Sequence, residues 1–236
     1  MSRMTPAQRH YEKAMAKKSE KENTSGYFEK GSAYELIMAK LHSDVQRLKQ
    51  IQSIELKIKA KKEILPDYQP WVDGVLESGK GAQDAVLMTI LVWHIDVGNY
   101  DDAFRIAEYA MQNDLVMPDQ YSRDLATVLL DEISGAMLKQ KFDTPEAIED
   151  ALSVLKKTEE LTASRDAPDQ ARAKLCKALA QALLAKIGDG DITAENKAAA
   201  LEAKAYLNRA LELDERSGVK AELKRLEKRL EQVSQG

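Results

Sequence analysis

Apolar residues between positions 32 and 64 recur every three or four residues, the spacing of one face of an α-helix. Ser32 followed by Glu35 has the form of a capping box, and Pro66 disfavours helix at Leu65. The pattern predicts one continuous helix over 32–64, about 50 Å long at 1.5 Å per residue. A narrow stripe on so long a helix favours a coiled-coil or bundle contact between copies of the chain. The predicted oligomerisation residues are Ile37, Leu41, Val45, Leu48, Ile51, Ile54 and Ile58.

A second apolar block covers residues 71–98. It predicts a short helix that ends at Ser78-Gly79, followed by a helix over 85–95 that is apolar nearly all round and therefore central to the core. No sustained apolar–polar alternation predicts a sheet, so the fold class is all-α.

Further helices are expected along the rest of the chain. Two stretches, around Ala103 and around Ala203–Leu213, resemble single tetratricopeptide units, in which small residues let paired helices pack closely. No period of about 34 residues is maintained, so helical hairpins are predicted rather than a repeat array. The expected helices lie at 120–140, 145–162, 168–187, 195–213 and 218–233.

Residues 1–30 are polar and lysine-rich with few large aliphatic side chains, which predicts disorder or a frayed helix. The expected organisation has four parts. They are a basic flexible arm at 1–31, the long oligomerisation helix at 32–66, a central helical core at 67–142 and C-terminal helical hairpins at 143–236.

Charge is divided unevenly along the chain. Residues 1–66 carry 14 Lys and Arg against 8 Asp and Glu, net +6, whereas residues 67–236 carry 21 against 31, net −10. A basic end suits the phosphates of DNA, and an acidic end better suits protein partners. A solubility role for the same charges remains an alternative. The candidate DNA-binding residues are Arg3, Arg9, Lys13, Lys17, Lys18, Lys21, Arg47, Lys49, Lys57, Lys61 and Lys62.

The sequence offers no pattern typical of a catalytic, metal or cofactor site. A single cysteine, Cys176, excludes an internal disulfide and a Cys-based zinc site, and it is interpreted as a small buried hydrophobe. His10, His42 and His94 lack metal-ligand spacing, and no phosphate-binding loop is present. The aspartates around Asp96 and Asp119 lack the Glu-x-Lys continuation of a nuclease core. No catalytic residue, metal or cofactor is therefore predicted.

No apolar run reaches the roughly 20 residues that cross a bilayer, and the N-terminus lacks the apolar stretch of a signal peptide. The expectation is a soluble protein with no membrane partner.

Several strings of the sequence are similar to those of a known family, the small terminase subunit (M protein, or terminase endonuclease subunit) of Peduovirus-type tailed phages. The resemblance covers residues 1–125 and continues more weakly to the C-terminal hairpin. The strings are TPAQRH at 5–10, YEL at 34–36, RLKQIQSIE at 47–55, LPxYxPWVxGVLxSGxGAQD at 65–84, VLMT at 86–89, WxIDxGxY at 93–100 and LVMPDxY at 115–121.

The resemblance implies a part in viral genome packaging. A member of this family is expected to bind the double-stranded cohesive-end DNA of the phage and to act with a large terminase subunit that carries the ATPase. It is also expected to assemble with itself, as a ring, in the cytoplasm of the host cell. Two alternatives stay open. One is a metal-dependent endonuclease that cuts at the cohesive-end site, and the other is a helical-repeat adaptor that binds a protein partner.

Overall fold

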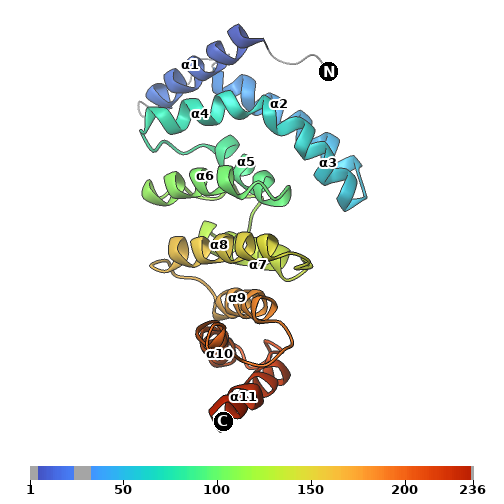
Figure 1. Ribbon diagram of the computed structural model, residues 1–236. Coiled ribbons are helices and arrows are strands. Elements are labelled where there is room, and N and C mark those ends of the chain that lie inside the picture. Colours follow the sequence, from blue (N-terminus) through green and yellow to red (C-terminus); the bar gives the residue numbers. More distant parts are fainter. Residues whose placement is uncertain (1–4, 24–32, 235–236) are drawn as a thin grey trace. The chain divides into compact units, whose positions relative to one another are not determined.

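The computed structural model describes residues 5–23 and 33–234, and the side chains of 18–23 and 233–234 fall outside the description. Every regular element in the described part is helical, which confirms the all-α prediction (Figure 1). The elements are α1 Pro6–Asn23, α2 Ala33–Gln50, α3 Ile54–Ile64, the 3-10 turn η1 Leu65–Asp67, α4 Gln69–Ser78, α5 Ala85–Asp96, α6 Tyr100–Gln112, α7 Leu125–Met137, α8 Pro145–Thr162, α9 Asp169–Ile187, α10 Lys197–Leu213 and α11 Lys220–Ser234.

The chain divides into two compact units, residues 1–125 and residues 126–236. We call them unit 1 and unit 2. The finer four-part scheme expected from the sequence stays a prediction, although two of its elements take a different form in unit 1. In the described part of the chain, no helix has the length and apolarity to cross a membrane.

The core of unit 1 is centred on α5, as its apolar composition predicts. Val86, Leu87, Met88 and Ile90 have no exposed surface. Asp84 begins the helix, because its carboxylate accepts the backbone N–H of Leu87 at 2.9 Å. The same carboxylate accepts the indole N–H of Trp71 at 2.8 Å, so one buried side chain caps α5 and holds α4 to it.

The expected single helix over 32–64 is wrong. Helix α2 ends at Gln50, residues 51–53 are not helical, and α3 begins at Ile54. Ser53 is the reason that the sequence offers, since its hydroxyl accepts the backbone N–H of Leu56 at 3.3 Å and caps α3. The chain then turns back on itself. Tyr68, beyond α3, donates to the Asp44 carboxylate of α2 at 2.8 Å, so α2 and α3 form a helical hairpin.

The expectation of a flexible N-terminal arm is also not met between Pro6 and Lys17. Helix α1 packs along α4 (Figure 1), and Ala16 is 0% exposed at that contact. A Cβ at Gly74 would lie 2.7 Å from the Cβ of Ala16, so the two helices approach as closely as a glycine allows. This contact joins two small residues distant in sequence, which no local pattern shows.

Unit 2 consists of helical hairpins, as predicted. Helix α9 packs against both α8 and α10, and α11 packs against α10. The buried face of α10 follows a three-and-four spacing through Ala200, Ala203, Leu207 and Ala210, each without exposed surface. Cys176 is buried in α9, and burial raises the pKa of its thiol to about 11. It therefore remains a protonated thiol at neutral pH.

Candidate nucleic-acid interface

Three of the predicted DNA-binding lysines, Lys49, Lys57 and Lys61, lie together in unit 1. They line one surface groove of about 260 Å³, which we call the lysine groove. The α2–α3 hairpin brings them there, because Lys49 lies in the last turn of α2 while Lys57 and Lys61 lie on α3. The other lining residues are Val45, Leu48, Thr89, Trp93, Gln120 and Tyr121.

The three lysines differ in how their charge is balanced. Lys61 forms an ion pair with Asp96 and lies 5.9 Å from the centre of the Trp93 ring. Lys49 and Lys57 have no ion pair with any of the described residues. The charges of Lys49 and Lys57 are therefore available to an external anion, whereas the charge of Lys61 is balanced by Asp96.

The opposite wall supplies neutral hydrogen-bonding groups from α5 and from the segment between α6 and α7. Gln120 donates its side-chain amide to the Thr89 hydroxyl at 3.5 Å, and Thr89 donates to the carbonyl of Ala85 at 2.7 Å. Lysine ammonium groups act as point charges for phosphate and carry no base specificity. The geometry thus suits contact with a nucleic-acid backbone.

The remaining basic residues are dispersed. Lys13 and Lys17 both pair with Glu77 of α4, Lys17 at 2.6 Å, so they fasten α1 instead of remaining free for phosphate. Arg47 lies 3.8 Å from Glu63. Arg3 and the side chains of Lys18 and Lys21 lie outside the described residues.

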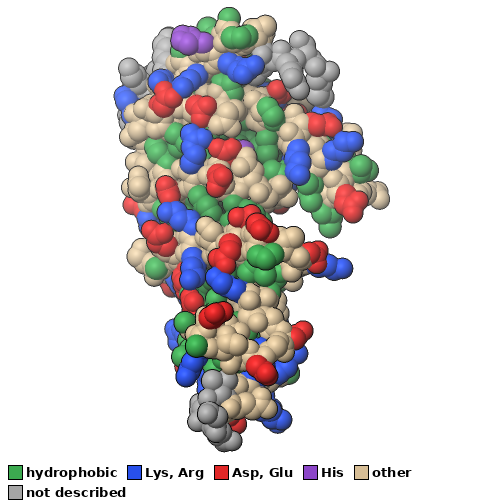
Figure 2. All heavy atoms as spheres, viewed as in Figure 1, with side chains coloured by type: hydrophobic (Ala, Val, Ile, Leu, Met, Phe, Trp, Pro, Cys, Tyr) green, Lys and Arg blue, Asp and Glu red, His purple; other side chains and the backbone are tan. Residues whose placement is uncertain are grey.

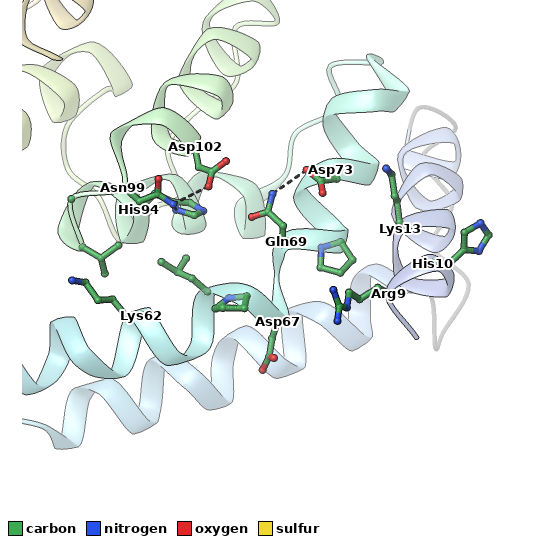
Figure 3. A pocket seen from close by; sticks show the side chains of 15 residues that line it. Arg9, His10, Lys13, Lys62, Asp67, Gln69, Asp73, His94, Asn99 and Asp102 are labelled. Atoms are coloured by element: carbon green, nitrogen blue, oxygen red, sulfur yellow. Dashed lines mark hydrogen bonds between the residues drawn. The ribbon is translucent and has the colours of Figure 1, made fainter. Parts of the chain in front are cut away.

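Arg9, Lys13 and Lys62 line a second and larger hollow of about 870 Å³, the mixed cleft, bounded by α1, α3, η1, α4 and the α5–α6 turn (Figure 3). Asp67, Asp73 and Asp102 also line it, so its charge is mixed. His94 is buried at 2% exposure in its wall. Sequence reasoning missed this cleft, since its residues come from six elements without a shared motif.

The predicted oligomerisation stripe serves mainly the core of unit 1. Ile37, Leu41 and Leu48 are buried, and Val45, Ile51 and Ile58 are half-buried. Ile54 alone of the seven is strongly exposed, at 75%, beside Leu56 at 58%. Figure 2 shows hydrophobic side chains at the free end of the α2–α3 hairpin, next to Lys and Arg side chains.

The sequence model of one family, the phage small terminase subunit, matches residues 38–170, more than half of the chain. The chain belongs to this family. A phage small terminase subunit takes part in the packaging of viral DNA, which is the function class of the protein. The resemblance inferred from the sequence is confirmed.

Two relatives agree with this membership. The "Terminase, endonuclease subunit" of Escherichia phage P2 is 38% identical over 226 residues, which cover 96% of this chain and 85% of the relative. The "Probable terminase, endonuclease subunit" of Haemophilus phage HP1 is 26% identical over 104 residues, 44% of this chain and 37% of the relative. No solved structure matches the chain.

The lysine groove lies within the segment that matches the family model. All of the residues that line the groove fall between 38 and 170, whereas Arg9 and Lys13 of the mixed cleft precede that segment. The matched segment contains five of the predicted DNA-binding residues, namely the three groove lysines together with Arg47 and Lys62.

Proposed function

We propose that this small terminase subunit binds double-stranded DNA of the phage packaging site through the lysine groove. It would present that DNA to a large terminase subunit in the cytoplasm of the host cell. The single observation that supports the proposal best is the convergence of Lys49 and Lys57, unpaired among the described residues, within the segment that matches the family. Phosphate contacts of this kind supply most non-specific DNA affinity.

The test is the salt dependence of duplex binding by a Lys49→Gln/Lys57→Gln protein. Each lost phosphate contact lowers the slope of log affinity against log salt by roughly 0.9, so the double variant should lose about 1.8. The matched control is Lys59→Gln/Lys80→Gln, which removes the same charge. Lys59 and Lys80 are exposed and line neither the groove nor the mixed cleft. Equal slopes for the two variants contradict the proposal.

Self-association is part of the same proposal, with its surface moved to the hairpin end. Ile54 and Leu56 offer exposed apolar area, whereas Leu48 is already buried inside unit 1. An Ile54→Ser/Leu56→Ser protein should lose mass in native mass spectrometry and keep its helicity. Leu48→Ser should lower stability instead. The copy number measured for the unchanged protein then tests whether the copies form a ring or another closed assembly.

The names of the two relatives raise DNA cleavage as a second candidate. Cleavage by metal ions needs carboxylates that converge on one point. Among the residues whose positions are described, no three His, Cys, Asp or Glu side chains form such a group. Incubation of the purified subunit with cohesive-end DNA and Mg²⁺ or Mn²⁺, without the large subunit, tests this candidate directly, and site-specific nicking would establish it.

A further inference from the structure

The mixed cleft contains a buried hydrogen-bond donor that the fold leaves unused. Asn99 donates its side-chain amide to Asp102 at 2.8 Å, and the same nitrogen lies 3.0 Å from Nδ1 of His94. The Asp102 carboxylate can only accept a hydrogen bond, so the side chain of Asn99 must direct its NH2 group towards Asp102. The same NH2 group lies next to Nδ1 of His94, and because it can only donate, Nδ1 must be the acceptor. The proton of the neutral imidazole is then on Nε2.

Nε2 of His94 is buried and has no hydrogen-bond partner in the described structure. Burial also lowers the pKa of His94, although Asp102 acts to raise it, so the ring is neutral at pH 7. A buried N–H without a partner costs about 1–3 kcal/mol, and most such groups in native proteins are satisfied. The donor therefore indicates a ligand acceptor at this wall of the cleft.

The cations of the cleft are not equally available. Lys13 is held by Glu77, and Arg9 already has an interaction within the chain. Lys62 has no ion pair with the described residues and lies at the opposite end of the cleft from Arg9 (Figure 3). A free ammonium and an unused N–H in one cleft together favour an anionic group rich in acceptor oxygens, such as a phosphate.

Each acidic residue of the cleft lies in an ion pair, and the cation of each pair is shared with a second carboxylate, so the negative charge of the cleft is partly balanced. Arg105 bridges Asp102 at 2.9 Å and Asp73 at 3.3 Å, and Lys40 lies 3.3 Å from Asp67. Burial acts to raise the pKa of Asp102, but hydrogen bonds from Asn99 and Arg105 outweigh burial and lower it. The Asp102 carboxylate therefore stays ionised and can accept an N–H group from a ligand.

The size of the cleft excludes a simple phosphate as its full occupant. About 870 Å³ is the volume of a site for a molecule of nucleotide size, and Leu65, Pro66, Pro70 and Val97 supply apolar surface for a planar base. Only a free mononucleotide or the terminal nucleotide of a strand combines a phosphate with a base in so small a unit.

We propose that the mixed cleft binds a nucleoside monophosphate unit, with its phosphate between Lys62 and the Nε2–H of His94 and its base over the Pro66–Pro70 surface. This site is distinct from the lysine groove, and it does not depend on duplex binding there. The phosphate monoester is the recognised chemistry, whether it belongs to a free nucleotide or to a strand end.

The experiment measures binding of a single-stranded tetranucleotide with either a 5′-phosphate or a 5′-hydroxyl to the full chain. The phosphorylated form should bind about tenfold more tightly, the weight of one charge-assisted hydrogen bond. Lys62→Gln should abolish that ratio, while Lys59→Gln, an exposed lysine of the same helix outside the cleft, should retain it. No preference in the unchanged protein, or equal ratios in the two variants, overturns the proposal.

Three further measurements complete the test. Deoxyadenosine monophosphate that binds as tightly as the phosphorylated tetranucleotide identifies a free nucleotide as the ligand, and weaker binding identifies a strand end. Inorganic phosphate that binds as tightly as either one overturns the nucleotide assignment. In the unchanged protein, the imidazole ¹⁵N resonances should show a proton on Nε2 of His94 that shifts on addition of the nucleotide. A proton found on Nδ1 of His94 would also overturn the proposal.

The Lys49→Gln/Lys57→Gln protein separates this result from the proposed function. It should weaken duplex binding and keep the ratio of affinities for the 5′-phosphate and 5′-hydroxyl forms.

Discussion

Units 1 and 2 carry nearly the same charge but use it differently. Residues 1–125 have 17 basic and 19 acidic residues, and residues 126–236 have 18 and 20, so each unit has a net charge of −2. In unit 1, the lysine groove keeps two cations without ion pairs among the described residues. A surface hollow in unit 2, at the α10–α11 turn, is lined by Glu212, Glu215 and a single lysine. Net charge therefore does not distinguish the two units; the arrangement of the charges does.

Buried polar groups do not divide the two units in the same way. In unit 2, the hydroxyls of Thr158 and Thr162 donate to carbonyls within their own helix, at 2.8 Å each, so their donors are already used. In unit 1, Asp84 binds two elements together, and His94 retains a donor without a partner. Among the described residues, buried polar atoms without a hydrogen-bond partner occur in both units, and those of unit 2 belong to Ser134, Ser217, Glu222 and Arg229. What sets His94 apart is its position in the wall of the mixed cleft.

The largest effect is expected from the core of unit 2. Leu207→Ala removes a fully buried side chain from α10 and should lower the free energy of unfolding by about 3 kcal/mol. Leu201→Ala, on the same helix but 51% exposed, should change it by less than about 0.5 kcal/mol. Urea unfolding measures both. Duplex affinity of the folded Leu207→Ala protein should stay unchanged, and a loss of affinity would show that unit 2 takes part in DNA binding.

A smaller effect is expected where α1 meets α4 in unit 1. Gly74→Val places side-chain atoms against Ala16 and the carbonyl of Lys13, and such overpacking costs about 2 kcal/mol. Gly190→Val in unit 2 is the control, because a Cβ there meets no atom within 4 Å. Amide hydrogen exchange should become faster in α1 of the first variant only. Unchanged protection of α1 would mean that this helix is not held by the Ala16–Gly74 contact.

The smallest effect concerns the ion pairs of α1 and depends on pH. Hydrogen bonds from Lys13 and then Lys17 lower the pKa of Glu77 to about 2, from an ordinary value of 4.5. Since the folded-state pKa is the lower one, these contacts stabilise docked α1 above about pH 4.5, and that stabilisation is lost as the pH falls towards 2.

Thermal unfolding of Glu77→Gln between pH 2 and 6 should therefore show a shallower loss of stability than the unchanged protein. Glu55→Gln removes the same charge from an exposed position on α3 and serves as the control. The effect is small, because the groups are exposed and salt screens them. A Glu77→Gln profile parallel to that of the unchanged protein would mean that the pairs do not contribute.

Local patterns predicted the helices well from Trp71 onward, because each has a strong apolar face and a recognisable start. Thr144, for example, caps α8 through the N–H of Ala147 at 3.2 Å. The stripe over 32–64 misled because its spacing continues through Ser53, and a single capping hydroxyl decides between one helix and a hairpin. The position of α1 depends on the distant Gly74, which short-range reasoning cannot reach.

The candidate site was predicted in its residue types but not in its geometry. On one straight helix, Lys49 and Lys61 would lie about 18 Å apart along the axis, and no groove would exist. The hairpin brings them to one groove with residues of α5. The unused donor of His94 depends on Asn99 and Asp102, and nothing in the sequence around position 94 indicates which ring nitrogen would be left over.

The contact between Ala16 and Gly74 also affects how the chain acquires its structure during synthesis. The two residues are 58 positions apart, so at roughly 5–20 residues per second the ribosome adds Gly74 about 3–12 s after Ala16. Helix α1 must wait that long for its partner. Its sequence suits the delay, since it is rich in lysine and glutamate and holds few large apolar side chains that could attract other nascent chains. The first helix to be made therefore cannot pack in its final place until α4 has been made.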